Sequence, residues 1–292
     1  MAQIVLLRLG DEMQSSIFNN MYQPLCDDIS QKYSTIQAKS AADVRPLLSH
    51  PSLQAILVVD GGLTIGKEHI ALQKQLSSYA HAGGTIIFCC LFSSFTRPPD
   101  FNRMFRSFGL PWEFGDYHRT TFYLSQHIRS ILGHQRAIEL EREYSMKAVH
   151  LKNTLVGSRV YVPHEQSRTQ SRVFAPTAVD QGQTPAAFSK HGSGWIGYIG
   201  DVNNEEGSRS LVMALLDLAT STDTSAASKR RSSSSSSTMT TSHNIGCSIC
   251  GQLTPVMKCS RCHTTQYCST DCQKADWKEH KIYCGMPSLE PA

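Results

Sequence analysis

The sequence has 292 residues, of which 40% are hydrophobic and 18% charged, and its formal net charge is +4. This length suits one medium domain with a small module beside it, and no apolar run approaches the ~20 residues that cross a bilayer. Ten cysteines without such a segment suggest a soluble chain whose thiols stay reduced. We therefore expect an intracellular protein, in the nucleus, the cytoplasm or both.

The first 220 residues alternate apolar runs with helical patterns. We expect strands at 4–9, 33–38, 53–59 and 85–91, with helical segments between them at 15–31, 40–49 and 67–81. Continuous apolar runs such as 53–59 are typical of strands that are buried on both faces. The alternation favours a parallel sheet with helices on both sides, which makes residues 1–220 an α/β domain.

The pattern is less regular after Phe92. We expect a short helix at 101–108, extended segments within 112–124, and weak strands at 145–152 and 160–162. Order returns with a glycine-containing strand at 194–200, followed by a helix at 205–219. Acidic residues open this last helix, as its dipole prefers.

Two strand ends, Asp60-Gly61-Gly62 and Cys89-Cys90, and the later segment 197–201 resemble a class I glutamine amidotransferase-like domain of flavodoxin-like fold. Active members of that family place a cysteine at a glycine-flanked elbow, where a histidine activates it. Neither cysteine here has a glycine neighbour, so we expect both to lie within a buried strand as small apolar residues. The alternative is an amidohydrolase or amidotransferase-like hydrolase that uses Cys90 as its nucleophile.

Polar residues and glycines follow the carboxyl ends of three predicted strands, where open α/β sheets bind their ligands. These residues are Asp60, Gly61, Gly62, Ser93, Ser94 and Asp201. One interpretation is a pocket for a small molecule or peptide. The favoured interpretation is that Asp60 and Asp201 cap turns and helices.

Residues 221–243 are rich in serine and threonine and include Lys229-Arg230-Arg231 followed by six serines. Such a tract buries too little apolar surface to offset the entropy lost on ordering. We expect it to be a disordered linker.

Eight residues of metal-ligand type fall between positions 247 and 284, in four pairs. Four protein ligands close a structural zinc site, so eight predict two zinc ions. The pairs are Cys247 and Cys250, Cys259 and Cys262, Cys268 and Cys272, and His280 and Cys284. Disulfides are disfavoured, because these spacings and the single histidine belong to metal chemistry. Seven thiolates with two Zn²⁺ bring the net charge near +1 and leave this module mildly acidic, which argues against a nucleic-acid partner.

The order and spacing of these ligands resemble the MYND zinc finger, and we place the module at 244–286. The resemblance implies a cross-braced fold, in which the first and third pairs hold one zinc and the second and fourth hold the other. It also implies a groove at Gln273 and Trp277 that accepts proline-rich peptides of partner proteins, commonly in transcriptional regulation. The tail at 287–292 contains Pro287-Ser288-Leu289-Glu290-Pro291, a Pro-x-Leu-x-Pro pattern of the kind that such grooves accept. The chain's own tail is therefore a candidate ligand, in the same molecule or in a neighbour.

These patterns predict a zinc-binding interaction adaptor, and no residue is assigned a catalytic role. Zinc with four protein ligands has no open position for a reacting water. A lysine methyltransferase would need a SET domain around the finger, and the flanking sequence contains none. A RING ubiquitin ligase would place its histidine among the middle ligands, whereas His280 is the seventh of eight.

Overall fold

The computed structural model describes residues 2–221, 257–263 and 265–284. The chain divides into two compact units, one holding nearly all of residues 2–221 and the other holding the described part of 257–284. Apart from Ser221, the predicted linker lies outside the described residues, as do the predicted tail and the pair Cys247 and Cys250. No helix among the described residues is both long and apolar enough to cross a membrane.

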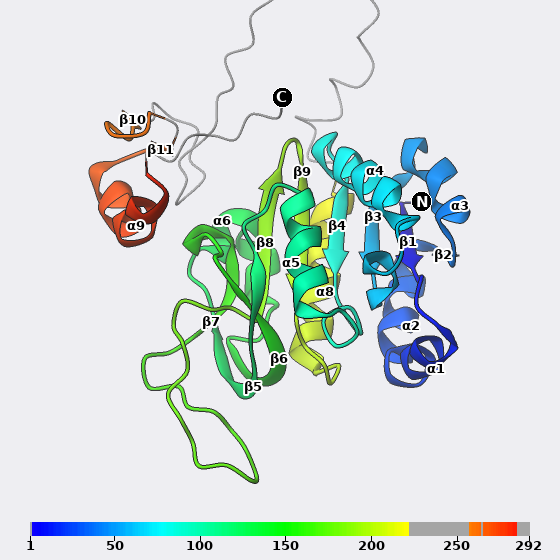
Figure 1. Ribbon diagram of the computed structural model, residues 1–292, viewed down its shortest axis with the longest axis horizontal. Helices are drawn as coiled ribbons and strands as arrows, with labels where there is room; N and C mark the ends of the chain where they lie inside the picture. Colours follow the sequence, from blue (N-terminus) through cyan, green and yellow to red (C-terminus); the bar gives the residue numbers. More distant parts are fainter. Residues whose placement is uncertain (1, 222–256, 264, 285–292) are drawn as a thin grey trace, which may run out of the picture. The chain divides into compact units, whose positions relative to one another are not determined.

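The larger unit is built on a nine-stranded sheet (Figure 1). One half is parallel and consists, in order across the sheet, of β2 (Ser34–Ala38), β1 (Gln3–Leu7), β3 (Leu53–Val58), β4 (Thr85–Phe88) and β9 (Gly194–Ile199). The other half is antiparallel and continues with β8 (Ala186–His191), β7 (Arg159–Pro163), β5 (Glu113–Leu124) and β6 (Glu143–Lys152).

The sheet is therefore mixed, and the prediction of a parallel sheet is wrong for its second half. At the junction of the two halves, the physical reason is the length of the connection. A parallel pair needs a crossover of a dozen or more residues, whereas β8 and β9 are joined by the two residues Gly192 and Ser193. Gly192 adopts the left-handed conformation (φ 59°) that such a tight turn favours.

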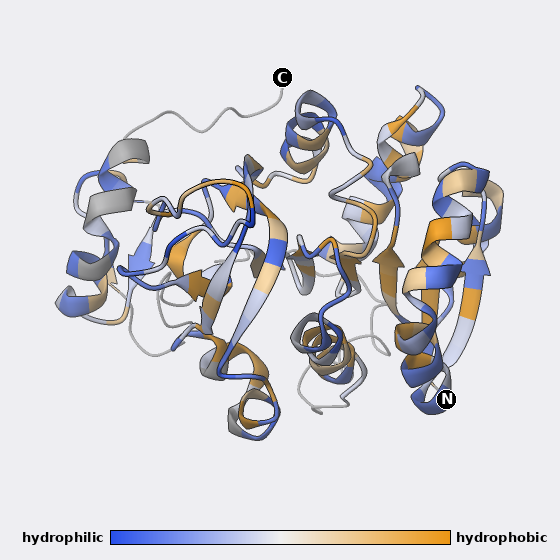
Figure 2. Cartoon of the chain, turned by 90° about the horizontal axis from the view of Figure 1, so that it is seen from below, coloured by the Kyte–Doolittle hydropathy of each residue, from blue (hydrophilic) through white to orange (hydrophobic). Residues whose placement is uncertain are grey.

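Helices cover both faces of the parallel half (Figures 1 and 2). On one face lie α4 (His69–His81) and α5 (Pro98–Ser107), and on the other α8 (Glu206–Thr220), with α2 (Gln23–Lys32) packed against α8. The other helical segments are α1 (Glu12–Met21), α3 (Ala41–Val44), α6 (Ile128–Leu132), α7 (His134–Ile138) and the 3-10 turns η1 (Arg45–Ser49), η2 (Gly61–Thr64) and η3 (Val156–Ser158).

A cluster of buried aromatic rings fixes α5 against the sheet. Phe88 on β4 lies 5.1 Å from Phe105, and Tyr198 on β9 lies 5.5 Å from Phe101, measured between ring centroids. Burying each phenylalanine contributes roughly 1.5–3 kcal/mol. These rings hold both ends of the loop 89–97, and that loop contains two of the predicted pocket residues.

The described part of the smaller unit has little apolar core. A two-stranded hairpin, β10 (Met257–Lys258) and β11 (Gln266–Tyr267), precedes α9 (Thr270–Tyr283). The Ser269 hydroxyl caps this helix by accepting the N–H of Cys272 at 3.2 Å. The buried apolar cluster consists of Tyr267 with Cys259 and Cys284, so thiols fill the place that aliphatic side chains take in larger domains.

Candidate metal centre

Four predicted ligands meet at one point of the smaller unit. They are Cys259, Cys262, His280 and Cys284, whose ligand atoms all lie within 4.8 Å of one another. The first two sit in the turn between β10 and β11, and the last two stand one helical turn apart at the end of α9. Spacings of i, i+4 on a helix put both side chains on one face, which is why the ligand atoms of His280 and Cys284 lie close together.

The distances fit a tetrahedral metal. Cys259 Sγ lies 3.7 Å from Cys284 Sγ, and His280 Nε2 lies 3.2 Å from Cys259 Sγ and 3.5 Å from Cys262 Sγ. Zinc–sulfur bonds of about 2.3 Å at tetrahedral angles separate two sulfurs by about 3.7 Å. A disulfide needs about 2.05 Å, so the two cysteines are not bonded to each other. Three thiols with one imidazole suit zinc, which would serve here as a structural ion.

Neighbouring polar groups orient the His280 ring and favour the thiolate form of Cys259. The Thr265 hydroxyl lies 3.3 Å from His280 Nδ1, so it can hold the ring with Nε2 turned toward the metal. Burial by itself raises the pKa of the Cys259 thiol, but the backbone N–H groups of Cys262 and Arg261 and the contact with His280 bring it below its ordinary value. The lower pKa favours the thiolate, which is the form that binds zinc.

Two members of the other predicted site lie within the described residues. Cys268 lies just before the N-cap of α9 and Cys272 lies in its first turn, with their sulfurs 3.5 Å apart. They are separate from the group of four, which agrees with the interleaved order that the resemblance implies. Their expected partners, Cys247 and Cys250, lie outside the described residues, so the second site remains a prediction.

A hydrogen bond inside the finger joins β11 to α9. The Tyr267 hydroxyl donates to Asp276 Oδ2 at 2.6 Å, and both side chains are buried. Burial and the adjacent carboxylate raise the pKa of Tyr267, which keeps its hydroxyl protonated as a donor. Sequence reasoning found neither this bond nor the role of Thr265, because no spacing rule links these positions to the ligands.

The two predicted peptide-binding residues lie on α9. Gln273 and Trp277 are four residues apart and therefore share one face of the helix. Trp277 is 39% exposed, a high value for the largest side chain, and its ring lies 6.0 Å from that of His280. The metal ligand thus packs beside the indole that faces solvent.

The residues predicted to form a pocket in the larger unit do not converge. Asp60 Oδ1 accepts the N–H groups of Leu9 (3.2 Å) and Gly62 (3.0 Å), which closes the turn after β3. Asp201 accepts the N–H groups of Asn203 (2.8 Å) and Glu205 (2.7 Å) ahead of α8. Burial raises the pKa of both carboxyl groups, while these N–H donors lower it. Both side chains are occupied as caps.

The two glycines after Asp60 are required by close packing of the backbone. A Cβ at Gly61 would lie 2.3 Å from the carbonyl oxygen of Phe95, and one at Gly62 would lie 2.1 Å from the carbonyl carbon of Leu9. Neither position can take a side chain unless the backbone moves. Gly61 and Gly62 therefore serve the fold at this turn.

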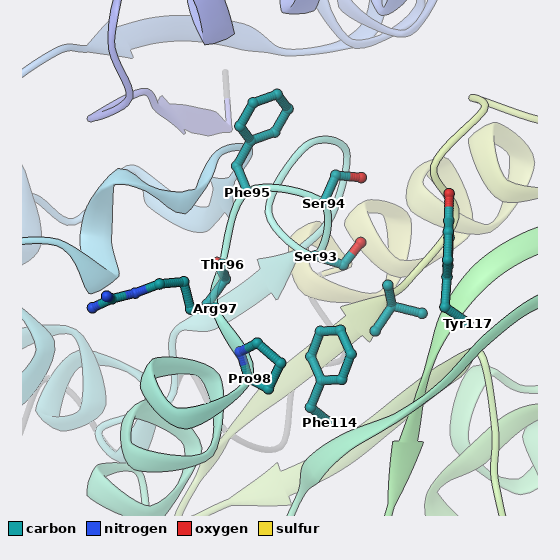
Figure 3. A pocket seen from close by; sticks show the side chains of 9 residues that line it. Ser93, Ser94, Phe95, Thr96, Arg97, Pro98, Phe114 and Tyr117 are labelled. Carbon is teal, nitrogen blue, oxygen red and sulfur yellow. The ribbon is translucent and has the colours of Figure 1, made fainter.

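Ser93 and Ser94 do line a cavity of about 580 Å³, between the loop 89–97 and β5 (Figure 3). Phe114, Tyr117 and Val149 form its other side, and Arg97 and Pro98 also line it. Ser94 is exposed, whereas the Ser93 hydroxyl is buried and donates to the Gly200 carbonyl at 3.4 Å. Of the six predicted residues, only these two share an opening.

The prediction that Cys89 and Cys90 lie within a strand is wrong, although both are buried as expected. β4 ends at Phe88, because the chain turns sharply at Cys90, whose φ of 59° is left-handed. Such a backbone is unusual without glycine. The small cavity beside Cys90 is lined by no histidine within the described residues, whereas a histidine activates the cysteine in active members of the family that the sequence resembles.

Comparison with known proteins gives a match at the finger. Residues 247–284 match the family model described as the MYND finger. The chain is 42% identical over 38 residues to Egl nine homolog 1 of Homo sapiens and 54% identical over 39 residues to ubiquitin carboxyl-terminal hydrolase 19 of Arabidopsis thaliana. Each match covers 13% of this chain, but only 9% and 6% of those relatives. This chain is also 57% identical over 30 residues to the MYND-type zinc finger protein samB of Emericella nidulans. That match covers 10% of this chain and 5% of samB.

Solved structures resemble the larger unit only remotely. A thua-like protein from Bacteroides uniformis aligns with a TM-score of 0.47 and 9% identity, over 77% of this chain and 93% of its own. β-Galactosidase from Bacillus circulans aligns with a TM-score of 0.47 and 11% identity, over 74% of this chain and 31% of its own. Neither likeness assigns a fold family, so the flavodoxin-like interpretation stays a prediction.

Proposed function

Because residues 247–284 are a MYND finger, a zinc-binding protein-interaction module, we propose that this protein is an adaptor that recruits proline-rich peptides of partner proteins. The observation that carries the proposal is the exposed indole of Trp277, which packs on α9 beside the ring of the predicted zinc ligand His280. Transcriptional regulation is the proposed setting, and it rests on the family resemblance alone.

The geometry of α9 supports a peptide groove at Gln273 and Trp277. A polyproline helix is already extended, so it docks on an aromatic face at low entropic cost. The Gln273 amide, one turn before the indole, can donate to a peptide carbonyl and so set the position of the ligand. His280 packs against Trp277, so zinc binding also orients the indole.

We propose two zinc ions in the finger, bound by interleaved pairs. The described site takes the second and fourth pairs, and the other site would take Cys268 and Cys272 with Cys247 and Cys250. Such bracing suits a unit whose small core is made mainly of ligand cysteines, because metal binding then supplies most of the folding free energy.

For the larger unit we propose a flavodoxin-like, amidotransferase-like fold that provides a second interaction surface. The surroundings of Cys90 support a non-catalytic role. Cys90 is buried, and its thiol lies 3.5 Å from that of Cys89 rather than against a base. The cavity at Ser93 and Ser94 offers the exposed Ser94 hydroxyl and the rings of Phe114 and Tyr117 to a neutral ligand or a peptide side chain.

The test is to titrate the full chain with a Pro-x-Leu-x-Pro peptide. Trp277→Ala should raise Kd at least about tenfold, because an aromatic anchor in an interface is commonly worth 2 kcal/mol or more. Lys274→Ala, an exposed change on the same helix, is the matched control and should bind like the parent chain. Zinc content is measured for each variant, and Trp277→Phe replaces Trp277→Ala if the alanine variant loses metal. Unchanged affinity in a zinc-loaded Trp277 variant would contradict the proposal.

A further inference from the structure

The larger unit carries a projecting segment, residues 164–178, which we call the arm. It extends away from the sheet between β7 and β8 (Figure 1). A bridge between Arg168 and Ala178 closes its base, and the Thr169 N–H donates to the Thr177 carbonyl at 2.9 Å. Beyond this closure, residues 170–176 belong to no helix or strand. Gln170 still donates its backbone N–H to the Arg119 carbonyl of β5 at 2.8 Å, so the tip that begins at Ser171 is anchored to the sheet immediately before it.

Ser171 presents an accessible hydroxyl at this tip. Its side chain is exposed, and its Oγ accepts the backbone N–H groups of Val173 (3.1 Å) and Phe174 (3.0 Å). Ser167, in the same arm, is half-buried, and its hydroxyl accepts the His164 N–H and donates to the Thr121 carbonyl. Of these two serines, Ser171 is the one that another protein can reach.

Charge and apolar surface flank Ser171 in a directional pattern. Exposed arginines stand three residues before it, at Arg168, and one residue after it, at Arg172. Val173 and Phe174 follow, and they are 82% and 76% exposed. An enzyme that bound this tip would need carboxylates for the arginines and an apolar recess for the two side chains. Protein kinases whose peptide groove is lined with carboxylates offer these features.

We propose that Ser171 is a phosphorylation site for an arginine-directed serine/threonine kinase. The Ser171 oxygen attacks the γ-phosphorus of ATP, its proton passes to the kinase's catalytic base, and the bond from phosphorus to the ADP oxygen breaks. The phosphate group of the product would find hydrogen-bond donors in the same turn. The two N–H groups that now bond to Oγ point toward the position of the new phosphate oxygens, and the Arg172 guanidinium lies next in the chain.

The test uses the full chain, Mg-ATP and the catalytic subunit of cAMP-dependent protein kinase, with sites mapped by tandem mass spectrometry. Ser171 should take up phosphate in the folded protein, and Arg168→Gln should slow that step roughly tenfold through loss of a charge-assisted contact. Ser167→Ala is the matched control and should leave the rate at Ser171 unchanged. The serines after Lys229-Arg230-Arg231 report that the kinase is active. Phosphate on those serines without any on Ser171 would overturn the proposal.

A second measurement tests whether the N–H groups of Val173 and Phe174 bind the phosphate. Backbone amide exchange at Val173 and Phe174 should slow several-fold on phosphorylation, because a dianionic acceptor holds these N–H groups more strongly than a neutral hydroxyl does. Arg172→Ala should remove part of that slowing, while the phosphate is still added. Exchange that does not change between the unmodified and the phosphorylated chain would overturn the role given to the two amides.

Discussion

Burial determines the chemistry of Cys90. Its side chain is 4% exposed, and burial, followed by the contact with the Cys89 thiol, raises the pKa of Cys90 well above its ordinary value. The thiolate is the nucleophilic form, so at neutral pH almost no reactive species is present. The left-handed backbone at this position shapes the loop that follows β4.

Alkylation of the native protein checks this interpretation. With iodoacetamide at pH 7.5, Cys26, which is partly exposed, should react at least about tenfold faster than Cys90. Both pKa values are raised, Cys26 chiefly by burial, so both rates should increase as the pH rises. Denatured protein is the control, in which both thiols should react alike. Preferential labelling of Cys90 in the native chain would revive the hydrolase alternative.

At the scale of elements, the bond between Tyr267 and Asp276 braces β11 against α9. Tyr267→Phe removes the donor and leaves a buried carboxylate unpaired, which costs about 1–3 kcal/mol. We expect faster zinc loss to a chelator and a lower melting temperature for the finger. Asp276→Asn keeps an acceptor oxygen and should have a smaller effect. Equal rates of zinc loss for the parent chain and Tyr267→Phe would show that the bond does not hold the finger together.

Strands with long apolar runs can be read from the sequence, and strands with broken patterns cannot. The run at 53–59 predicts β3 to within a residue, because a strand buried on both faces has few positions for polar residues. β8 escapes prediction because Ser189, Lys190 and His191 interrupt its apolar pattern. Its place in the sheet depends on the hairpin to β9, and the local signal for that hairpin is the two-residue turn Gly192-Ser193.

The zinc site could be predicted from the sequence, whereas the pocket could not. Zinc ligands are predictable because each pair is fixed by local spacing, and only the meeting of two pairs needs the fold. The proposed pocket required three distant loops to aim their side chains at one point. Asp60 and Asp201 turn instead toward N–H groups in their own surroundings, because a buried carboxylate without donors is costly. Position at a strand end does not determine the direction of a side chain.

At the scale of the whole molecule, the tail is predicted to compete for the finger. The Pro-x-Leu-x-Pro segment at 287–291 lies outside the described residues and starts three residues after the ligand Cys284. A tethered ligand acts at a raised effective concentration, so it blocks the groove in the same molecule or in a neighbour. A chain that ends at Gly285 should bind an added proline-rich peptide more tightly, several-fold by calorimetry. If peptide affinity and oligomeric state are both unchanged, the tail has no gating role.

We propose that this protein works through a finger that zinc ions fold. The most direct measurement is the zinc content of the full chain, purified without chelator, by elemental mass spectrometry. We expect two equivalents per chain, falling to about one in Cys268→Ser, which leaves the described ligand group intact. Cys259→Ser should lower zinc content while the larger unit keeps its melting transition, because the two units are separate. One equivalent or none in the parent chain would contradict the proposal that two zinc ions fold the finger.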